Sequence, residues 1–267
     1  MSNSNNEKNS GAVEKLLDIM VSLREKCPWD KKQTLESLRY LTIEEVYELS
    51  DAILDGNLSE IKKELGDLLL HIVFYAQIGK EKNAFDFADV VVEICQKLIL
   101  RHPHVFGETQ VSDAEEVKSN WEKIKLKEGR KSVLEGVPKS LPAMVKAYRI
   151  QEKVRGVNFD WENSAQVLEK IKEEIAEFEQ EAQFSNAEKM ESEFGDILFS
   201  LINYARFHNI NPEDALENTN RKFIDRFRKM EALIENSGKQ LTQMSLAEMD
   251  LFWDEAKRSN TEILAHR

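Results

Sequence analysis

The chain has 267 residues, with 37 basic and 49 acidic side chains, and its formal net charge is −12. This charge argues against direct nucleic-acid binding, because general nucleic-acid binders present a basic surface to phosphates. Gly and Pro are scarce, at 10 and 5 residues, which favours an all-α fold over a sheet protein rich in turns.

The beginning of the chain and its longest apolar run both argue against a membrane protein. Residues 1–11 are polar, which predicts disorder, and they lack the apolar segment of a signal peptide. The run at 68–78 is interrupted by His71 and Gln77 and is too short and too polar to cross a bilayer. The two cysteines show no C-x-x-C spacing and indicate no disulfide framework. Together these features predict a cytoplasmic protein without membrane partners.

The first half of the chain is predicted to be a series of helices joined by short turns. Apolar residues recur at helical spacing, and clusters of Gly, Asn, Asp or Pro separate the periodic segments. The predicted helices cover 13–24, 41–54, 58–78, 85–100 and 115–127, with a loop at 27–30 and a helix stop at 101–104.

The second half repeats this order after a predicted linker at 129–142, which holds two Gly and two Pro. Helices are predicted at 143–153, 165–184, 187–207, 212–236 and 245–259, with a loop at 158–161. No alternating apolar pattern indicates a strand. The sequence therefore predicts two tandem all-α domains of about four main helices each. Their predicted bounds are 12–128 and 143–260, and the C-terminal domain is followed by a tail at 261–267.

One acidic motif occurs in each half with the same internal spacing. The sequence E-E-x-x-E is followed, sixteen residues after its last Glu, by E-x-G-D, and the two copies are 129 positions apart. Chance rarely places so many matching residues in one register, so the halves are predicted to be repeats. The copies comprise Glu44, Glu45, Glu48, Glu64, Gly66 and Asp67, and then Glu173, Glu174, Glu177, Glu193, Gly195 and Asp196.

The spacing of these acids indicates a divalent-metal site built from two helices. Glu174 and Glu177 are three residues apart and share a helix face, and so do Glu193 and Asp196 on the next helix. Antiparallel helices would point these carboxylates at one another, and a hard cation such as Mg²⁺ or Mn²⁺ would relieve their repulsion. The alternative is a pair of solvated acidic helix faces. The matching acids of the first half, Glu45, Glu48, Glu64 and Asp67, predict a second metal site.

The glycine within each motif is a further signal. Gly inside a helix costs about 1 kcal/mol relative to Ala, so its recurrence needs a reason. Gly66 and Gly195 predict either that a ligand approaches the backbone closely or that two helices pack tightly there.

Each half also carries a Lys/Arg pair one helical turn apart and a Trp one turn before a Lys. The pairs are Lys97 with Arg101, Lys222 with Arg226, Trp121 with Lys125, and Trp253 with Lys257. Carboxylates for Mg²⁺, cations for phosphate and a Trp to stack on a base together predict a nucleotide site. For each residue alone, a solvated charge or a core Trp is the alternative.

The halves differ in the cations near the acids. Lys170 and Lys189 flank the second motif, whereas the matching positions of the first half are Leu41 and Glu60. A load of several phosphates would be held less well in the first half. We therefore expect the C-terminal half to be the main catalyst and the N-terminal half to be weaker, specialised or structural.

These residues closely resemble the MazG family of all-α nucleoside triphosphate pyrophosphohydrolases, and the resemblance covers about 13–257. Both copies fit the pattern E-E-x-x-E followed by E-x-x-D, and the segments 27–30, 101–104 and 223–227 resemble two-domain members. The resemblance implies Mg²⁺-dependent hydrolysis of NTPs and dNTPs to monophosphate and pyrophosphate, as housecleaning of the nucleotide pool. It also implies a homodimer in which helices of both chains build the four-helix bundles.

The resemblance further implies roles for individual residues. The metal ligands would be Glu174, Glu177, Glu193 and Asp196, with Glu45, Glu48, Glu64 and Asp67 in the N-terminal half. Substrate would be bound by Lys222, Arg226, Trp253 and Lys257, and charge adds Lys170 and Lys189 to this set. Glu173, which completes the predicted catalytic set, is either a general base or ligand-orienting group, or an acid of the helix surface.

Two alternatives come from other functional classes. A di-iron carboxylate bundle needs E-x-x-H on two helices, but His71 follows Asp67 by four positions and Ser200 replaces it in the second copy. A non-catalytic helical regulator that binds nucleotides would be favoured by degenerate acids, yet all the acids are present. Nucleotide binding without turnover would support the regulator.

Overall fold

The computed structural model describes residues 2–129 and 131–264 of the chain. Every regular element in these ranges is helical, which confirms the all-α prediction. The elements are α1 (Ser2–Lys26), η1 (Asp30–Lys32), α2 (Leu35–Leu54), α3 (Leu58–Glu81), α4 (Phe87–Arg101), α5 (Pro103–Phe106), α6 (Ala114–Lys127), α7 (Ala143–Arg155), α8 (Ser164–Gln183), α9 (Ala187–Phe207), α10 (Pro212–Asn236), η2 (Leu241–Gln243) and α11 (Leu246–Leu264). The chain divides into two compact units, Met1–Gln110 and Val111–Arg267.

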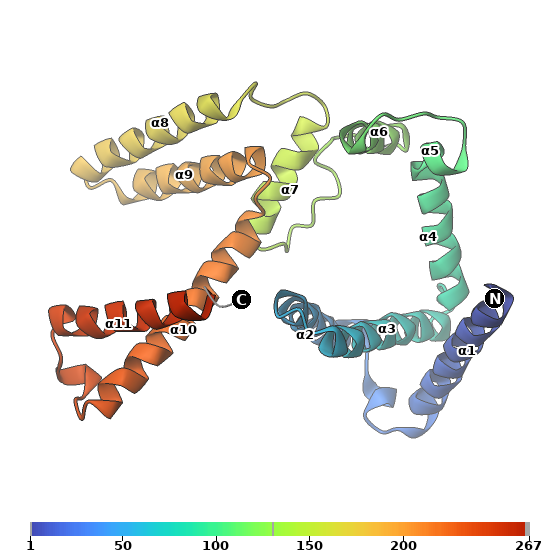
Figure 1. The fold of residues 1–267 in the computed structure, drawn as a ribbon. Helices are drawn as coiled ribbons and strands as arrows, with labels where there is room; N and C mark the ends of the chain where they lie inside the picture. Colours follow the sequence, from blue (N-terminus) through green and yellow to red (C-terminus); the bar gives the residue numbers. More distant parts are fainter. Residues whose placement is uncertain (1, 130, 265–267) are drawn as a thin grey trace. The chain divides into compact units, whose positions relative to one another are not determined.

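The first unit is organised around a hairpin of α2 and α3, against which α1 packs (Figure 1). Local chemistry sets the bounds of this hairpin. Thr34 and Ser37 form a reciprocal capping box at the start of α2, and the Asn57 side chain accepts hydrogen bonds from two backbone N–H groups at the start of α3. Between them Gly56 adopts φ +66°, a conformation that favours Gly, so the chain reverses sharply there.

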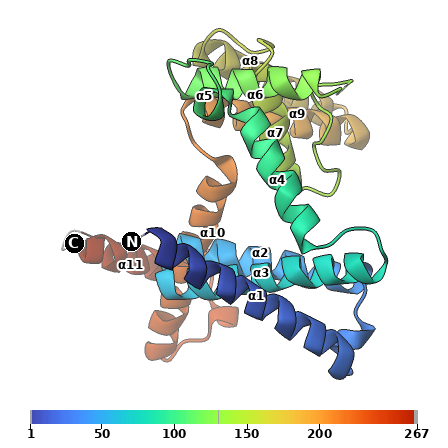
Figure 2. The same ribbon diagram turned by 90° about the vertical axis from the view of Figure 1, so that its right-hand side faces the viewer.

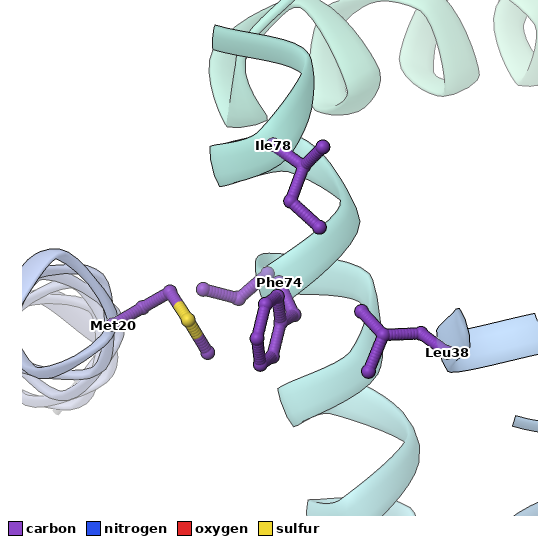
Figure 3. Packing of buried hydrophobic residues seen from close by; sticks show 5 residues of the cluster. Met20, Leu38, Phe74 and Ile78 are labelled. Atoms are coloured by element: carbon purple, nitrogen blue, oxygen red, sulfur yellow. The ribbon is translucent and has the colours of Figure 1, made fainter. Parts of the chain in front are cut away.

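The core of the first unit joins these three helices (Figure 3). Met20 of α1, Leu38 of α2 and Phe74 and Ile78 of α3 are almost completely buried together. Arg24 contacts this core from α1, because its guanidinium lies 5.5 Å from the centre of the Phe74 ring. The core therefore holds α1 against the hairpin that carries the first acidic motif.

The second unit contains two hairpins, α8–α9 and α10–α11, and α7 packs against α9 (Figure 1). Asn163 and Asn186 accept backbone hydrogen bonds at the starts of α8 and α9, and Asn211 does so at the start of α10, where Pro212 is the first helical residue. Both views show the α10–α11 hairpin directed away from α8–α9, and α10 contacts α7 and α9 (Figures 1 and 2).

The N-terminal residues and the predicted linker both lie within the compact units. Residues 2–11 belong to α1. Met20 anchors this helix in the core, and a helix that is already nucleated extends at little cost. The boundary between the compact units falls at 110/111, so segment 129–142 belongs to the second unit. The buried ammonium of Lys153 on α7 donates to the carbonyls of Val133 and Glu135, which ties this segment into the second unit.

The last helix, α11, extends into the predicted C-terminal tail. Of the predicted tail, 261–264 continue α11, and 265–267 lie outside the described residues. Among the described residues, no helix combines the length and the apolar character that crossing a membrane requires.

Replacing Phe74 with Ala is expected to lower the free energy of unfolding of the first unit by about 3–5 kcal/mol, because it removes a buried ring from the core. Urea denaturation followed by circular dichroism measures this change. Leu58→Ala is the control, because Leu58 is 80% exposed and its loss should cost less than about 0.5 kcal/mol. Equal losses in the two variants would contradict this description of the core.

Candidate metal and nucleotide site

The acids of the second motif lie on the faces that their helices turn toward the neighbouring helix. On α8, Val167, Ile171 and Glu174 are all buried and follow one another at spacings of four and three residues. Glu174 therefore continues the apolar stripe of an amphipathic helix. On α9, the partly buried Glu193 lies seven residues before the buried Ser200, so it also continues a buried stripe. Helix packing thus brings the carboxylates together.

The geometry confirms that three predicted ligands of the second motif converge. One carboxylate oxygen each from Glu174, Glu177 and Glu193 lies within 4.8 Å of the others. Asp196, the fourth predicted ligand, is exposed and does not belong to this group. Its place as a ligand stays a prediction.

The electrostatics of this cluster show the cost of assembling like charges. The pKa of Glu177 is raised, first by desolvation and then by the nearby carboxylates of Glu174 and Glu193. The ammonium of Lys170 opposes this repulsion, and its Nζ lies 2.8 Å from Glu173 Oε1 and 2.7 Å from Glu174 Oε1. The hydrogen bond to Glu173, followed by the one to Glu174, raises the pKa of Lys170.

The first motif forms the corresponding cluster on α2 and α3. Glu45, Glu48 and Glu64 also place carboxylate oxygens within 4.8 Å of one another. Burial raises the pKa of Glu45, and the carboxylate of Asp67 has the next largest effect. Asp67 is thus close enough to act on this cluster electrostatically, although it is not among its three converging residues.

Glu64 provides the observation that tests whether a cation fits. Its side chain is 5% exposed, and one oxygen accepts a hydrogen bond from Lys63 Nζ at 2.8 Å. The other oxygen, Oε2, is buried and has no hydrogen-bond partner. A buried carboxylate oxygen without a partner is costly, and a cation among three carboxylates would satisfy it. The all-oxygen donor set suits a hard ion such as Mg²⁺ or Mn²⁺.

The motif glycines are not explained by packing within one chain. A Cβ atom added to Gly66 or to Gly195 would meet nothing within 4 Å. Tight helix–helix packing inside a single chain is therefore wrong as the explanation. Close approach by a ligand or by another chain stays a prediction.

The predicted aromatic and cationic residues of the C-terminal half meet on α10 and α11. The Arg226 guanidinium lies 5.0 Å from the centre of the Trp253 ring, and the Phe223 ring centre is 5.2 Å from that of Trp253. Arg226 Nε is buried without a hydrogen-bond partner. Trp253 also packs against the core of this hairpin, so the alternative of a core Trp is correct for part of its surface. Lys222 and Lys257 are exposed on the same two helices.

This pair and the acids of the second motif lie on different hairpins of the chain. Arg226 and Trp253 lie on the α10–α11 hairpin, which is directed away from α8–α9 in both views (Figures 1 and 2). In the first half, Lys97 and Arg101 lie on α4, whereas Trp121 and Lys125 lie on α6 and belong to the other compact unit. In the second half the predicted constellation is therefore distributed over two hairpins.

The remaining predicted cation lies at the turn of the α8–α9 hairpin. Lys189 Nζ donates to Glu181 Oε1 at 3.1 Å, which joins the start of α9 to the last turn of α8. Lys189 is one helical turn from Glu193, so it is close to the cluster but pairs outside it.

Two buried groups in the first unit, Glu64 and His71, have partners that their sequence positions did not predict. Lys63 neutralises Glu64 from the adjacent position, a spacing that helix periodicity does not single out. Thr42 Oγ1 lies 2.7 Å from His71 Nδ1 and 2.6 Å from the Tyr75 hydroxyl, and the three side chains form a network between α2 and α3. In the sequence, this network could have been predicted from the polar residues Thr42, His71 and Tyr75, which interrupt the apolar stripes of two predicted helices.

Two helix hairpins that each gather three glutamates define a duplicated all-α fold with paired acidic clusters. The family model of the MazG nucleotide pyrophosphohydrolase domain matches residues 33–106 and 162–230, which include both clusters. The chain belongs to the MazG family. This membership confirms the resemblance noted in the sequence, the tandem repeat and the enzyme class of a hydrolase.

Several curated proteins are similar to the chain over most of its length. The nucleoside triphosphate pyrophosphohydrolase/pyrophosphatase MazG of Thermotoga maritima is 45% identical over 249 residues, covering 91% of this chain and 95% of that protein. The nucleoside triphosphate pyrophosphohydrolase of Escherichia coli K12 is 39% identical over 260 residues, covering 94% and 99%. The uncharacterised protein YabN of Bacillus subtilis is 45% identical over 237 residues, which cover 87% of this chain and 48% of YabN.

Glu177→Gln is expected to raise the melting temperature of the metal-free protein at neutral pH, because it removes one of the repelling charges. The pKa of Glu177 is raised in the folded chain, so stability is lost as the pH rises through this pKa and the side chain ionises. Thermal unfolding in EDTA between pH 4 and 8 measures the difference, which should shrink toward the acidic end. Glu179→Gln, on the same helix but outside the cluster, is the control. A lower melting temperature for Glu177→Gln in EDTA would contradict the repulsion described above.

Proposed function

We propose that the chain hydrolyses ribo- and deoxyribonucleoside triphosphates at the bond between the α and β phosphates, releasing nucleoside monophosphate and pyrophosphate. The observation that carries this proposal is the convergence of Glu174, Glu177 and Glu193 in a member of the MazG family. The printed names of the Thermotoga and Escherichia relatives, which match over nearly their full lengths, support the same reaction. Its physiological role would be housecleaning of the nucleotide pool.

The acids of the C-terminal half would hold Mg²⁺, for which Mn²⁺ is a possible substitute, with Glu174, Glu177, Glu193 and Asp196 as its protein ligands. When bound, such an ion neutralises phosphate charge and lowers the pKa of a coordinated water. Glu173 is exposed beside the cluster and accepts a hydrogen bond from Lys170, so it can orient that lysine or accept a proton from an attacking water. Glu45, Glu48, Glu64 and Asp67 would hold a second ion in the N-terminal half.

The cations and the Trp would position the substrate. Lys222, Arg226 and Lys257 supply positive charge on α10 and α11, and Lys170 and Lys189 supply it on α8 and α9. These side chains would bind phosphate oxygens, while the exposed part of Trp253 would stack on the base. Because the first half has Leu41 and Glu60 where Lys170 and Lys189 stand, turnover would occur mainly in the C-terminal half.

Glu193→Gln is expected to lower the turnover number by at least about 100-fold, because it removes a charged ligand from the cluster. The assay incubates the protein with Mg²⁺ and a panel of NTPs and dNTPs and separates the products by chromatography. Glu191→Gln is the matched control, since Glu191 is an exposed acid two residues away and should not affect turnover.

Three results would contradict this assignment. Diphosphate and inorganic phosphate as products would place the attack on a different phosphorus. Turnover of Glu193→Gln near the wild-type value would show that the C-terminal cluster is not the catalytic site. Nucleotide binding without turnover in the wild-type protein would favour a non-catalytic regulator.

The same chain leaves large apolar side chains uncovered on both acidic hairpins, and we propose that a second copy covers them in a homodimer. An apolar face of this extent on paired helices marks an interaction surface. The dimer would also explain why the acids and the Arg226–Trp253 pair lie on different hairpins, because α10 and α11 of one chain could meet α8 and α9 of its partner. The exposed residues include Ile43, Val46, Leu65, Leu69 and Ile72 on α2–α3, and Ile175, Phe194, Leu198, Phe199 and Leu201 on α8–α9.

If the site is shared between chains, two inactive variants should complement each other. Glu193→Gln removes the acidic part and Arg226→Ala removes the cationic part, so a mixed dimer retains one intact site. Random exchange of subunits makes half of the dimers mixed, and activity should recover to about a quarter of the wild-type value. The measurement is pyrophosphate release after the two variants are co-expressed or unfolded and refolded together.

A mixture of Glu193→Gln and Glu177→Gln is the control, because both changes affect the same cluster and no mixed dimer would be intact. Recovery in the control as well as in the test mixture would contradict a shared site.

The two cysteines, Cys27 and Cys95, are free thiols, which suits the reducing cytoplasm where we propose that the enzyme works.

A further inference from the structure

Each acidic cluster has one buried carboxylate that is neutralised by a lysine of its own helix, but the two units use different helices. In the first unit the buried acid is Glu64 on α3, and Lys63 pairs with it. In the second unit the buried acid is Glu174 on α8, and Lys170 pairs with it. The buried acid and its lysine thus lie together on the second helix of the hairpin in the first unit, and together on the first helix of the hairpin in the second unit.

The sequence shows that the two lysines are not equivalent. At the repeat offset of 129, Lys170 corresponds to Leu41, and Lys63 corresponds to Ser192. Each cluster therefore has its lysine at a position where the other copy has a neutral residue. The position of Lys170 is one helical turn before Glu174, so the ammonium reaches the cluster along the helix axis.

The contacts of Lys170 are those of a cation standing at the edge of a metal cluster. Its Nζ lies 2.7 Å from Glu174 Oε1, and Glu174 is one of the three acids whose oxygens converge. A second contact of 2.8 Å joins the ammonium to the exposed Glu173. About a third of the Lys170 side chain is exposed, so its flexible stem can swing toward solvent without opening the core.

We infer that Lys170 is the counter-ion of the metal-free C-terminal cluster and that it transfers to the substrate's phosphates when a divalent cation binds. The inference rests on the proposed function, because it needs a cation and a polyphosphate at this site. It makes Lys170 a substrate-binding residue that links the two binding events, so that each of them favours the other.

Charge balance is the physical reason for the exchange. A divalent cation among Glu174, Glu177 and Glu193 competes with the ammonium for the Glu174 carboxylate and repels it at close range. A triphosphate then offers the displaced ammonium new oxygen partners. Because binding equilibria are linked, a nucleotide that captures Lys170 must also tighten the binding of the cation.

The test compares Lys170→Met with Lys172→Met in the full chain. Lys172 lies two residues away on α8 and pairs with Glu169 at 2.8 Å, so its replacement removes the same charge without touching the cluster. Both variants carry Glu45→Gln and Glu48→Gln to silence the N-terminal cluster. Isothermal titration with Mn²⁺ in the absence of nucleotide gives the affinity of the remaining cluster.

Lys170→Met is expected to bind Mn²⁺ at least about threefold more tightly than Lys172→Met, because the competing ammonium is gone. At saturating Mn²⁺ the same variant should bind a non-hydrolysable NTP analogue at least about threefold more weakly. Lys170→Arg keeps the charge and should restore the weaker Mn²⁺ affinity. Equal or weaker Mn²⁺ binding by Lys170→Met would overturn the inference.

This outcome can be separated from failure of the proposed function. The Mn²⁺ titration needs no turnover, so a wild-type protein that released no pyrophosphate would refute the proposed reaction without affecting the comparison of the lysine variants. Conversely, normal turnover together with equal Mn²⁺ affinities of Lys170→Met and Lys172→Met would refute the role of Lys170 and leave the reaction standing.

Discussion

Repulsion among carboxylates that helix packing forces together is the constraint on which the rest of this structure depends. Glu174 continues a buried apolar stripe, so folding the α8–α9 hairpin drives its charge against Glu177 and Glu193. The energy of the apolar contacts thereby holds like charges within one site. A divalent cation would relieve this repulsion more completely than a single lysine does, which is the physical reason for the metal site that we propose.

The acids lie on one hairpin, and Arg226 and Trp253 lie on another. This arrangement has the same cause as the exposed apolar faces of the hairpins. One chain supplies two-helix hairpins, and a hairpin covers only one side of each helix. The rings of Phe178 on α8 and Phe194 on α9 contact each other, with their centres 6.0 Å apart, yet Phe194 stays exposed together with Leu198 and Leu201. The second copy that we propose would cover that side and would bring Arg226 and Trp253 with it.

Much of this arrangement was predictable from periodicity and spacing. The two hairpins and the convergence of three acids per half follow from three-residue spacing on predicted helices, and they agree with the structure. The placement of Trp121 in the second unit was not predictable, because it depends on tertiary contacts that composition does not report. The pairing of Lys63 with Glu64 was not predicted either, because side chains at adjacent helix positions do not normally face each other.

The exchange of counter-ions between helices has an evolutionary consequence for the duplicated chain. Converting the first copy to the pattern of the second would require both a lysine at Leu41 and the loss of Lys63. A lineage that made the loss first would leave Glu64 buried with no compensating charge, whereas one that made the gain first would keep a counter-ion beside the three carboxylates throughout. The gain of the new lysine would therefore have to precede the loss of the old one, so a duplicated site of this kind can exchange its counter-ion in one order and not in the other.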